Sequence, residues 1–118
     1  MDNQRVRTRL EHMMAAIAAI ERLAGGLTAS DYASDPDRRA AVERYFEKLS
    51  EASRHLPSDL KAGHTSVPWR QLADLGNVLR HAYDQVSDAR VVMIVSHELQ
   101  ILKETVSFML SEISNTRD

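Results

Sequence analysis

Cysteine is absent from this chain of 118 residues. Disulfide bonds and thiolate chemistry are therefore excluded, and the composition is compatible with a reducing compartment. Long apolar runs are also absent, so no segment is suited to span a bilayer. The N-terminal sequence MDNQRVRTRL lacks the hydrophobic core of a signal peptide. We therefore expect a cytoplasmic protein that does not associate with a membrane.

A strong net charge is missing as well, because the formal charge is −2. No overall basic field attracts nucleic acid, so RNA binding needs a local basic patch. There is no glycine-rich phosphate loop, since Gly25-Gly26 lacks a following Lys and Ser/Thr and ends a predicted helix. The histidines show no spacing with Asp or Glu that builds a zinc site; they stand at positions 12, 55, 64, 81 and 97. We predict neither a metal nor a cofactor.

Apolar residues recur at three- and four-residue steps, and no strand pattern or internal repeat interrupts them. The apolar seam of the first predicted helix is Val6, Leu10, Met13, Ile17, Ile20 and Ala24, and that of the second is Val42, Tyr45, Leu49, Ala52 and Leu56. Hydrophobic residues make up 43% of the chain and charged residues 27%, which is typical of a single soluble domain. Short connectors between amphipathic segments favour antiparallel packing. We therefore predict an all-α, up-down antiparallel bundle of four main helices in a single domain, residues 1–118.

Capping signals set the expected helix boundaries. Gly25 ends the first helix, Asp35-Pro36 starts the second, Pro68 suits the first helical position of the third, and Ser87-Asp88 starts the fourth. The predicted helices span 4–24, 36–56, 67–84 and 87–114, with further short turns over 30–33 and 58–62.

The fourth predicted helix is apolar on two sides. The first stripe consists of Val92, Val95, Leu99, Leu102, Val106, Met109 and Ile113. A second stripe beside it consists of Val91, Ile94, Ile101 and Phe108. A small bundle needs one apolar stripe per helix. The second stripe indicates a homodimer, and the alternative is deeper burial within a monomer.

The third predicted helix carries the polar cluster best suited to chemistry. Its apolar stripe is Leu72, Leu75, Leu79 and Ala82, and the opposite side carries Arg70, Asp74, Asn77, His81 and Asp84. The simplest interpretation is a solvated face. Asn77 and His81 are nevertheless one turn apart, close enough to act on one ligand.

These residue types suit RNA cleavage. Histidine exchanges protons near neutral pH, so His81 could serve as the base for a 2′-OH or the acid for the leaving oxygen. The Asn77 amide could orient a phosphate or a ribose. Arg80 or Arg70 could supply positive charge. Tyr83 adds a hydroxyl close by in sequence, although its helical angle places it nearer the apolar side.

The chain resembles the HepT-like family of the HEPN group over nearly its whole length. RLEHMMAAIAAIERL and AVERYFEKLSEASRHLP resemble the first two family helices, Pro68-Trp69 leads into the third, and the segment from Asn77 through His81 to Tyr83 resembles the family signature. The resemblance implies a dimeric helical bundle that acts as the RNase toxin of a toxin–antitoxin pair. It also implies a catalytic His81, a polar companion Asn77, no metal, and a nucleotidyltransferase antitoxin that transfers AMP to Tyr83.

One position departs from the signature, because Gly76 stands where the family has an arginine. Loss of a phosphate-stabilising donor costs on the order of a hundredfold in rate. Arg80 points to a different side of the helix, and Arg70 lies about three turns away. Glycine inside a helix costs about 1 kcal/mol and marks close packing or a kink. The alternatives are a weakened RNase toxin, a non-catalytic helical subunit that docks a nucleotidyltransferase, and a purely structural dimer.

Overall fold

The computed structural model describes residues 3–81 and 87–115, with only the backbone described for residues 80, 81, 114 and 115. Within these ranges every regular element is a helix, which confirms the all-α prediction. The elements are α1 (Asn3–Ala24), α2 (Ala29–Ala33), α3 (Pro36–Arg54), α4 (Ser58–Ala62), α5 (Trp69–His81), α6 (Asp88–Met93), the π-helical η1 (Ile94–Glu98) and α7 (Leu99–Asn115).

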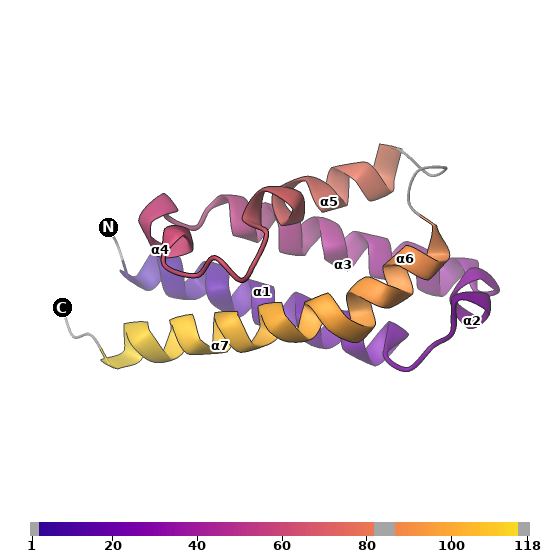
Figure 1. Cartoon of the computed structure of the whole chain (residues 1–118), viewed down its shortest axis with the longest axis horizontal. Helices are drawn as coiled ribbons and strands as arrows, with labels where there is room; N and C mark the ends of the chain where they lie inside the picture. Colours follow the sequence, from indigo (N-terminus) through magenta and orange to yellow (C-terminus); the bar gives the residue numbers. More distant parts are fainter. Residues whose placement is uncertain (1–2, 82–86, 116–118) are drawn as a thin grey trace.

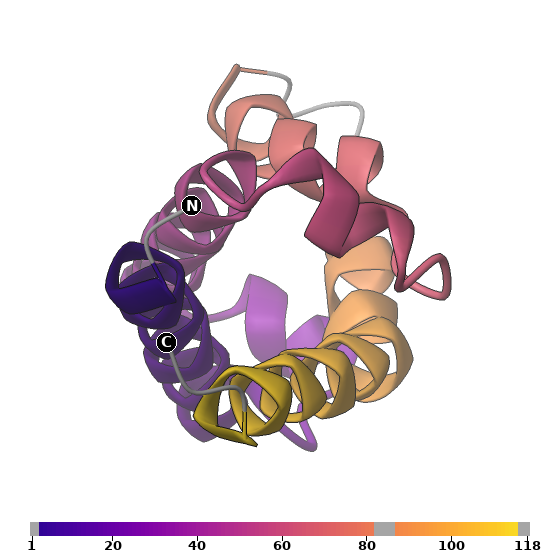
Figure 2. The ribbon, with the colours of Figure 1, turned by 90° about the vertical axis from the view of Figure 1, so that its left-hand side faces the viewer.

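The long helices run up and down in chain order (Figure 1). Helix α1 leads away from the N-terminus, α3 returns, α5 runs out again, and α6, η1 and α7 lead back to the C-terminus at the same end as the N-terminus. Seen end on, α5, α3, α1 and α7 follow one another around a ring (Figure 2). Helix α1 packs on both α3 and α7, whereas the main neighbour of α5 is α3.

The helices begin at the residues that the capping signals predict. The Asp35 carboxylate accepts the Arg38 N–H at 3.1 Å, and the Ser87 hydroxyl accepts the Arg90 N–H at 3.1 Å. Both side chains satisfy donors that an isolated helix start leaves unpaired. The first helical residue of α5 is Trp69, directly after Pro68. The Trp69 indole N–H donates to the carbonyl of His64 at 2.9 Å and ties this start to the preceding loop.

The core is a single apolar cluster inside the ring of helices. Its fully buried members come from α1, α3 and α7, with Tyr32 added by α2, and include Leu10, Met13, Ile17, Ile20, Val42, Phe46, Leu49, Val106 and Met109. Most of these core residues lie in the apolar seams that the sequence predicts for these helices. Phe46 was not among the predicted seam residues of its helix, and it is only 1% exposed.

The second apolar stripe of the last helix does not form one exposed face, so that expectation is wrong for its first half. Val91 and Ile94 are buried, whereas Ile101 and Phe108 are 46% and 57% exposed. The π-helical segment η1 begins at Ile94 and ends at Glu98, before Ile101. A π turn holds more residues than an α turn, so it rotates the following side chains relative to the preceding ones. The first stripe continues into the core, and Val95, Leu99, Leu102, Val106 and Met109 are all buried.

The short helix α2 is anchored by Tyr32, which is 1% exposed. The Arg39 guanidinium lies 5.9 Å from the centre of the Tyr32 ring and pairs with Asp88 at 3.3 Å. The Tyr32 hydroxyl is buried without a hydrogen-bond partner. Burial, and to a smaller extent the charge of Glu43, raises the pKa of Tyr32 to about 12.

No helix in the described parts of the chain is both long enough and apolar enough to cross a bilayer.

Candidate functional site

Gly76 marks the closest approach of α5 to α3. A Cβ atom built on Gly76 would lie 2.7 Å from the Cα of Glu47 and 3.2 Å from Oγ of Ser50. The Gly76 N–H also donates to the Ser50 hydroxyl at 3.0 Å, and Ser50 is fully buried. Gly76 is therefore a packing residue that lets two helix backbones come together, because any side chain here would push α5 away.

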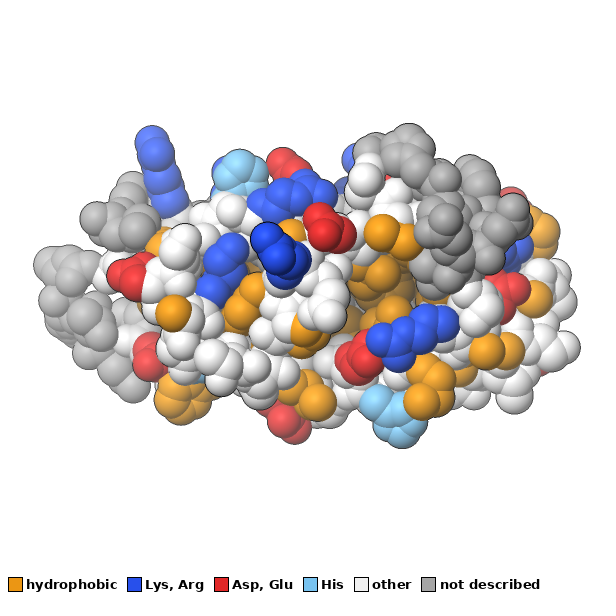
Figure 3. Space-filling model, turned by 45° about the horizontal axis from the view of Figure 1, so that its top comes forward, with side chains coloured by type: hydrophobic (Ala, Val, Ile, Leu, Met, Phe, Trp, Pro, Cys, Tyr) orange, Lys and Arg blue, Asp and Glu red, His pale blue; other side chains and the backbone are white. Residues whose placement is uncertain are grey.

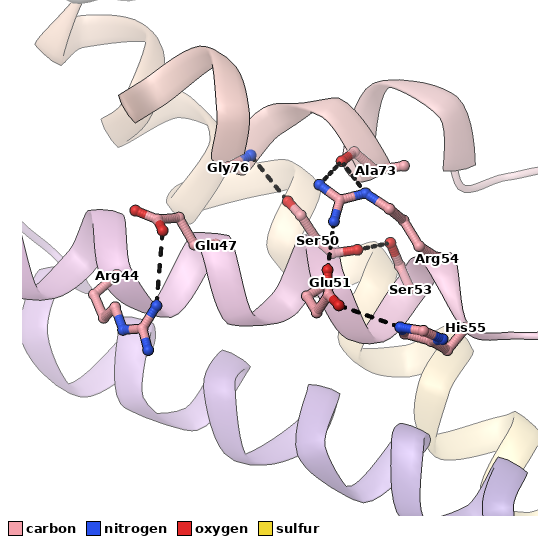
Figure 4. Close-up of polar contacts among 9 residues, drawn as sticks. All are labelled: Arg44, Glu47, Ser50, Glu51, Ser53, Arg54, His55, Ala73 and Gly76. Atoms are coloured by element: carbon pink, nitrogen blue, oxygen red, sulfur yellow. Dashed lines mark hydrogen bonds and ion pairs between the residues drawn. The ribbon is translucent and has the colours of Figure 1, made fainter. Parts of the chain in front are cut away.

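Arg54 clamps the same two helices about one turn further along (Figure 4). Its Nε and Nη2 atoms donate to the carbonyl of Ala73 at 3.1 and 2.8 Å. Its Nη1 atom donates to Glu51 at 2.6 Å. The hydrogen bond from His55, and then the nearby Arg54, lower the pKa of Glu51 below its ordinary value and keep that carboxylate ionised.

A polar pocket of about 300 Å³ lies along this α3–α5 seam. Asn77 and Gly76 line it from α5, and charged side chains line it from α3: Arg44, Glu47, Lys48, Glu51 and Arg54. The three cations outnumber the two carboxylates by one, and Arg44 and Arg54 are paired with Glu47 and Glu51. The pocket therefore carries a small positive excess, whereas the formal charge of the whole chain is −2.

The structure places the predicted site residues as follows. Asn77 is exposed and lines the seam pocket. The backbones of Arg80 and His81 form the last residues of α5, one turn beyond Asn77, and their side chains lie outside the described part. Tyr83 falls in residues 82–86, which the structure does not describe. Arg70 is exposed on the first turn of α5, at the other end of that helix.

The sequence pattern does not indicate that α3 contributes to the site. The stretch that forms α3 shows an apolar seam, whereas in the structure Ser50 and Ser53 are buried and Arg44 and Arg54 line the pocket. A signal was present in the spacing, because Arg44, Glu47, Glu51 and Arg54 recur at steps of three, four and three. Such spacing places charged residues on one helix side, but it does not show which helix that side meets.

A second hollow, of about 370 Å³, lies between α5 and the last helix (Figure 3). Its lining is mostly apolar and includes Leu72, Leu75, Ile94 and Leu102. Its two charged residues, Arg90 and Glu98, pair with each other at 2.9 Å. Proton transfer and phosphate binding need polar groups, so the chemistry fits the seam pocket better than this hollow. Among the described residues, no three His, Asp or Glu side chains are grouped so that they could hold a metal.

The fold and the seam define a small all-α helical protein with a polar pocket between two of its helices. Residues 13–109 match the family model described as ribonuclease HepT-like. The chain belongs to this family of ribonucleases.

Individual relatives agree with the family match. The chain is 37% identical over 83 residues to a protein of Thermococcus cleftensis named "Probable ribonuclease HepT", covering 70% of this chain and 74% of the relative. It is 26% identical over 103 residues to a protein of Caldanaerobacter subterraneus subsp. tengcongensis whose name describes a "Putative RNase", covering 87% and 92%. No solved structure matches the chain significantly.

Proposed function

We propose that the protein is a HepT-like toxin, a metal-independent endoribonuclease that a nucleotidyltransferase antitoxin neutralises by transferring AMP to Tyr83. In this proposal residues 1–118 form one HepT-like domain in the cytoplasm. The observation that carries it is the family match over residues 13–109, which includes Asn77 and His81 on the helix that borders the seam pocket.

The proposed reaction is an internal transesterification of RNA. His81 removes the proton of a ribose 2′-OH, whose oxygen attacks the adjacent phosphorus while the bond to the 5′-oxygen breaks. The leaving 5′-oxygen takes a proton from an acid, and the products are a cyclic phosphate and a free 5′-OH. Asn77 orients the phosphate or the ribose through its amide. Positive charge next to the phosphate stabilises the transition state.

Cleavage of a single-stranded RNA by the purified protein tests this proposal. We expect His81→Ala to lower kcat/KM by about a hundredfold to ten-thousandfold, the range for loss of a general acid–base group. His64→Ala is the matched control, because His64 lies outside α5 and bonds to Glu112 at 3.1 Å. Equal cleavage by wild type and His81→Ala would remove His81 from the mechanism.

The regulatory part of the proposal has its own test. The protein is mixed with a minimal nucleotidyltransferase and with ATP, and the intact mass is measured. We expect the mass of one AMP group to be added to wild type and not to Tyr83→Phe. An adduct that persists in Tyr83→Phe would place the modification on a different residue.

A homodimer is part of the proposed function. Three large hydrophobic side chains are exposed in the single chain: Met93 at the end of α6, and Ile101 and Phe108 on α7, at 49%, 46% and 57%. Exposed apolar groups of this size favour contact with a second surface. Sedimentation velocity should show a dimer that Ile101→Ser/Phe108→Ser converts to monomer, while Gln100→Ser on the same helix stays dimeric. A monomeric wild type would contradict this part.

A second candidate function is a non-catalytic helical subunit that docks the nucleotidyltransferase. Gly76 favours it, because this position has no arginine and is packed too closely on α3 to hold one. The RNA assay separates the two candidates. Absence of cleavage by wild type, together with stable binding of the nucleotidyltransferase, would select the non-catalytic subunit.

A further inference from the structure

The proposed ribonuclease chemistry needs a cation at the scissile phosphate, and α5 does not supply one from the family's position. Gly76 has no side chain, and a Cβ atom there would already be 2.7 Å from the Glu47 backbone. The cation must therefore come from another position. Arg80 directly precedes His81, so the two positions on the α5 backbone are about 100° apart around the helix axis, and Arg70 is eleven residues, roughly 16 Å, from His81 along the axis.

The register of the α3–α5 pair shows which part of α3 lies beside His81. The helices are antiparallel (Figure 1), and their closest backbone approach, between Gly76 and the Cα of Glu47, sets the register. From that point Arg44 lies three residues along α3, about 4.5 Å, and His81 lies five residues along α5, about 7.5 Å, in the same direction. The backbones of Arg44 and His81 are therefore offset by about 3 Å along the seam.

Arg44 also lines the pocket between α3 and α5, and because its guanidinium extends away from α5 in Figure 4, contact with a phosphate beside His81 requires its side chain to rotate. Arg44, Gly76 and Asn77 all line the same pocket of about 300 Å³. The Arg44 side chain is 66% exposed, so a ligand in the pocket can reach its guanidinium. Its ion pair with Glu47 is long, at 3.7 Å, and such an exposed pair contributes at most about 1 kcal/mol. A phosphate can displace that contact and accept two N–H groups of the guanidinium.

The other two cations of the pocket are occupied differently. Arg54 donates three hydrogen bonds, two to Ala73 and one to Glu51, so its guanidinium holds the helices together. Lys48 lies 5.4 Å from the centre of the Tyr45 ring, and both residues also line a separate pocket against α1. Arg44 is therefore the pocket cation whose position and contacts best suit a phosphate.

We propose that Arg44 of α3 is the residue that contacts the RNA phosphate beside His81, in place of the guanidinium that Gly76 lacks. In this proposal α3, and not α5, supplies the cation that contacts the phosphate. This inference rests on the proposed ribonuclease function, and it adds a catalytic residue that lies outside the signature segment.

Four proteins are compared in the cleavage assay: wild type, His81→Ala, Arg44→Ala and Arg38→Ala. Arg38 is the matched control because it lies on α3 and has a similar i,i+3 ion pair, with Asp35 at 3.8 Å, away from the pocket. We expect Arg44→Ala to lose about a hundredfold in kcat and Arg38→Ala to match wild type. Arg44→Lys should keep part of the activity, since it retains the charge without the planar fork.

Gly76→Arg supplies a second discriminating variant. If Arg44 has taken over the role, an arginine at position 76 cannot restore the missing group, because it disturbs the seam. We expect Gly76→Arg to be no more active than wild type and to leave Arg44→Ala unrescued. Wild-type cleavage by Arg44→Ala, with loss in His81→Ala, would overturn the role of Arg44 while leaving the ribonuclease proposal intact.

RNA binding decides the remaining case, in which wild type does not cleave RNA and the proposed function itself fails. Three variants are titrated into a fluorescein-labelled single-stranded RNA: His81→Ala, His81→Ala/Arg44→Ala and His81→Ala/Arg38→Ala. The fluorescence anisotropy of the RNA is measured over a series of salt concentrations. We expect the Arg44 variant alone to bind about tenfold more weakly, with the slope of log K against log salt reduced by about 0.7, as one lost phosphate contact predicts. Equal binding by all three, or no binding by any, overturns the proposal. Circular dichroism confirms that each variant is folded.

Discussion

Helices α1 and α5 both pack on α3, but by different physical means. Helix α1 contributes large apolar side chains to the core, and Leu10, Met13, Ile17 and Ile20 are completely buried. Helix α5 meets α3 through Gly76, a serine hydroxyl and an arginine clamp. Apolar packing depends on total volume and tolerates rearrangement, whereas a close backbone contact depends on the identity of single residues. The site lies on the second kind of interface, where the register of two helices is set most tightly.

The largest expected loss of stability comes from a substitution in the apolar contact between α1 and α3. Leu10→Ala should lower the free energy of unfolding by about 3 kcal/mol, because it removes a fully buried side chain and leaves a cavity. Leu75→Ala on α5 should cost only about 1 kcal/mol, since Leu75 is half-buried and borders an open hollow. Urea denaturation measures both. Equal losses would show that α5 is held by apolar burial as firmly as α1.

The close contact of α5 is tested by Gly76→Ala. Alanine gains about 1 kcal/mol of helix propensity, but overpacking against a backbone atom costs about 1–3 kcal/mol, so we expect a net loss of about 1 kcal/mol. Gly63→Ala is the matched control, because a Cβ atom there lies 3.5 Å from the nearest atom, at ordinary contact distance. We expect that control to be neutral or to gain about 0.5 kcal/mol. A stabilising Gly76→Ala would contradict the close-packing account.

A smaller effect is expected from Ser50→Ala, which removes the buried acceptor of the Gly76 N–H. We expect a loss of about 0.5–1 kcal/mol in the free energy of unfolding. Ser96→Ala is the comparison, since the exposed Ser96 hydroxyl bonds only to the carbonyl of Val92 in its own helix. No difference between the two variants in urea denaturation would mean that the seam does not depend on this hydrogen bond.

The smallest effect at neutral pH is expected from Tyr32→Phe. Polar groups of the seam are paired, whereas the Tyr32 hydroxyl is buried without a partner, so its removal should be nearly neutral. The pKa of Tyr32 is raised to about 12 in the folded state, so the unfolded state loses this proton first as pH rises. The preference of the folded state for protonated Tyr32 contributes fully to the free energy of unfolding below about pH 10, and this contribution disappears as pH rises toward 12.

The melting temperatures of wild type and Tyr32→Phe, measured at about pH 8 and about pH 11, test this sign. The variant should lose less stability than wild type between the two conditions. An equal decrease in both proteins would show that ionisation of Tyr32 does not contribute to alkaline unfolding.

Local signals in the sequence predicted the helices well. Asp35 and Ser87 cap the starts that were expected of them, and Gly25-Gly26 follows the end of α1. Such signals work because a cap is satisfied within a few residues of its own chain. The second stripe of the last helix failed as a prediction because the π turn at 94–98 rotates Ile101 and Phe108 relative to Val91 and Ile94.

The sequence by itself determined the all-α class, the capped starts of α3 and α6 and the ribonuclease family, because these depend on periodicity, capping and a local signature. It also showed that Gly76 departs from that signature. Only the tertiary structure decided what this departure means. Position 76 faces a backbone with no room for a side chain, and the same packing places Arg44, thirty-two residues earlier in the chain, in the pocket that Gly76 and Asn77 border. The physical reason is that the register between two helices depends on contacts between distant residues, which the periodicity of either helix does not specify.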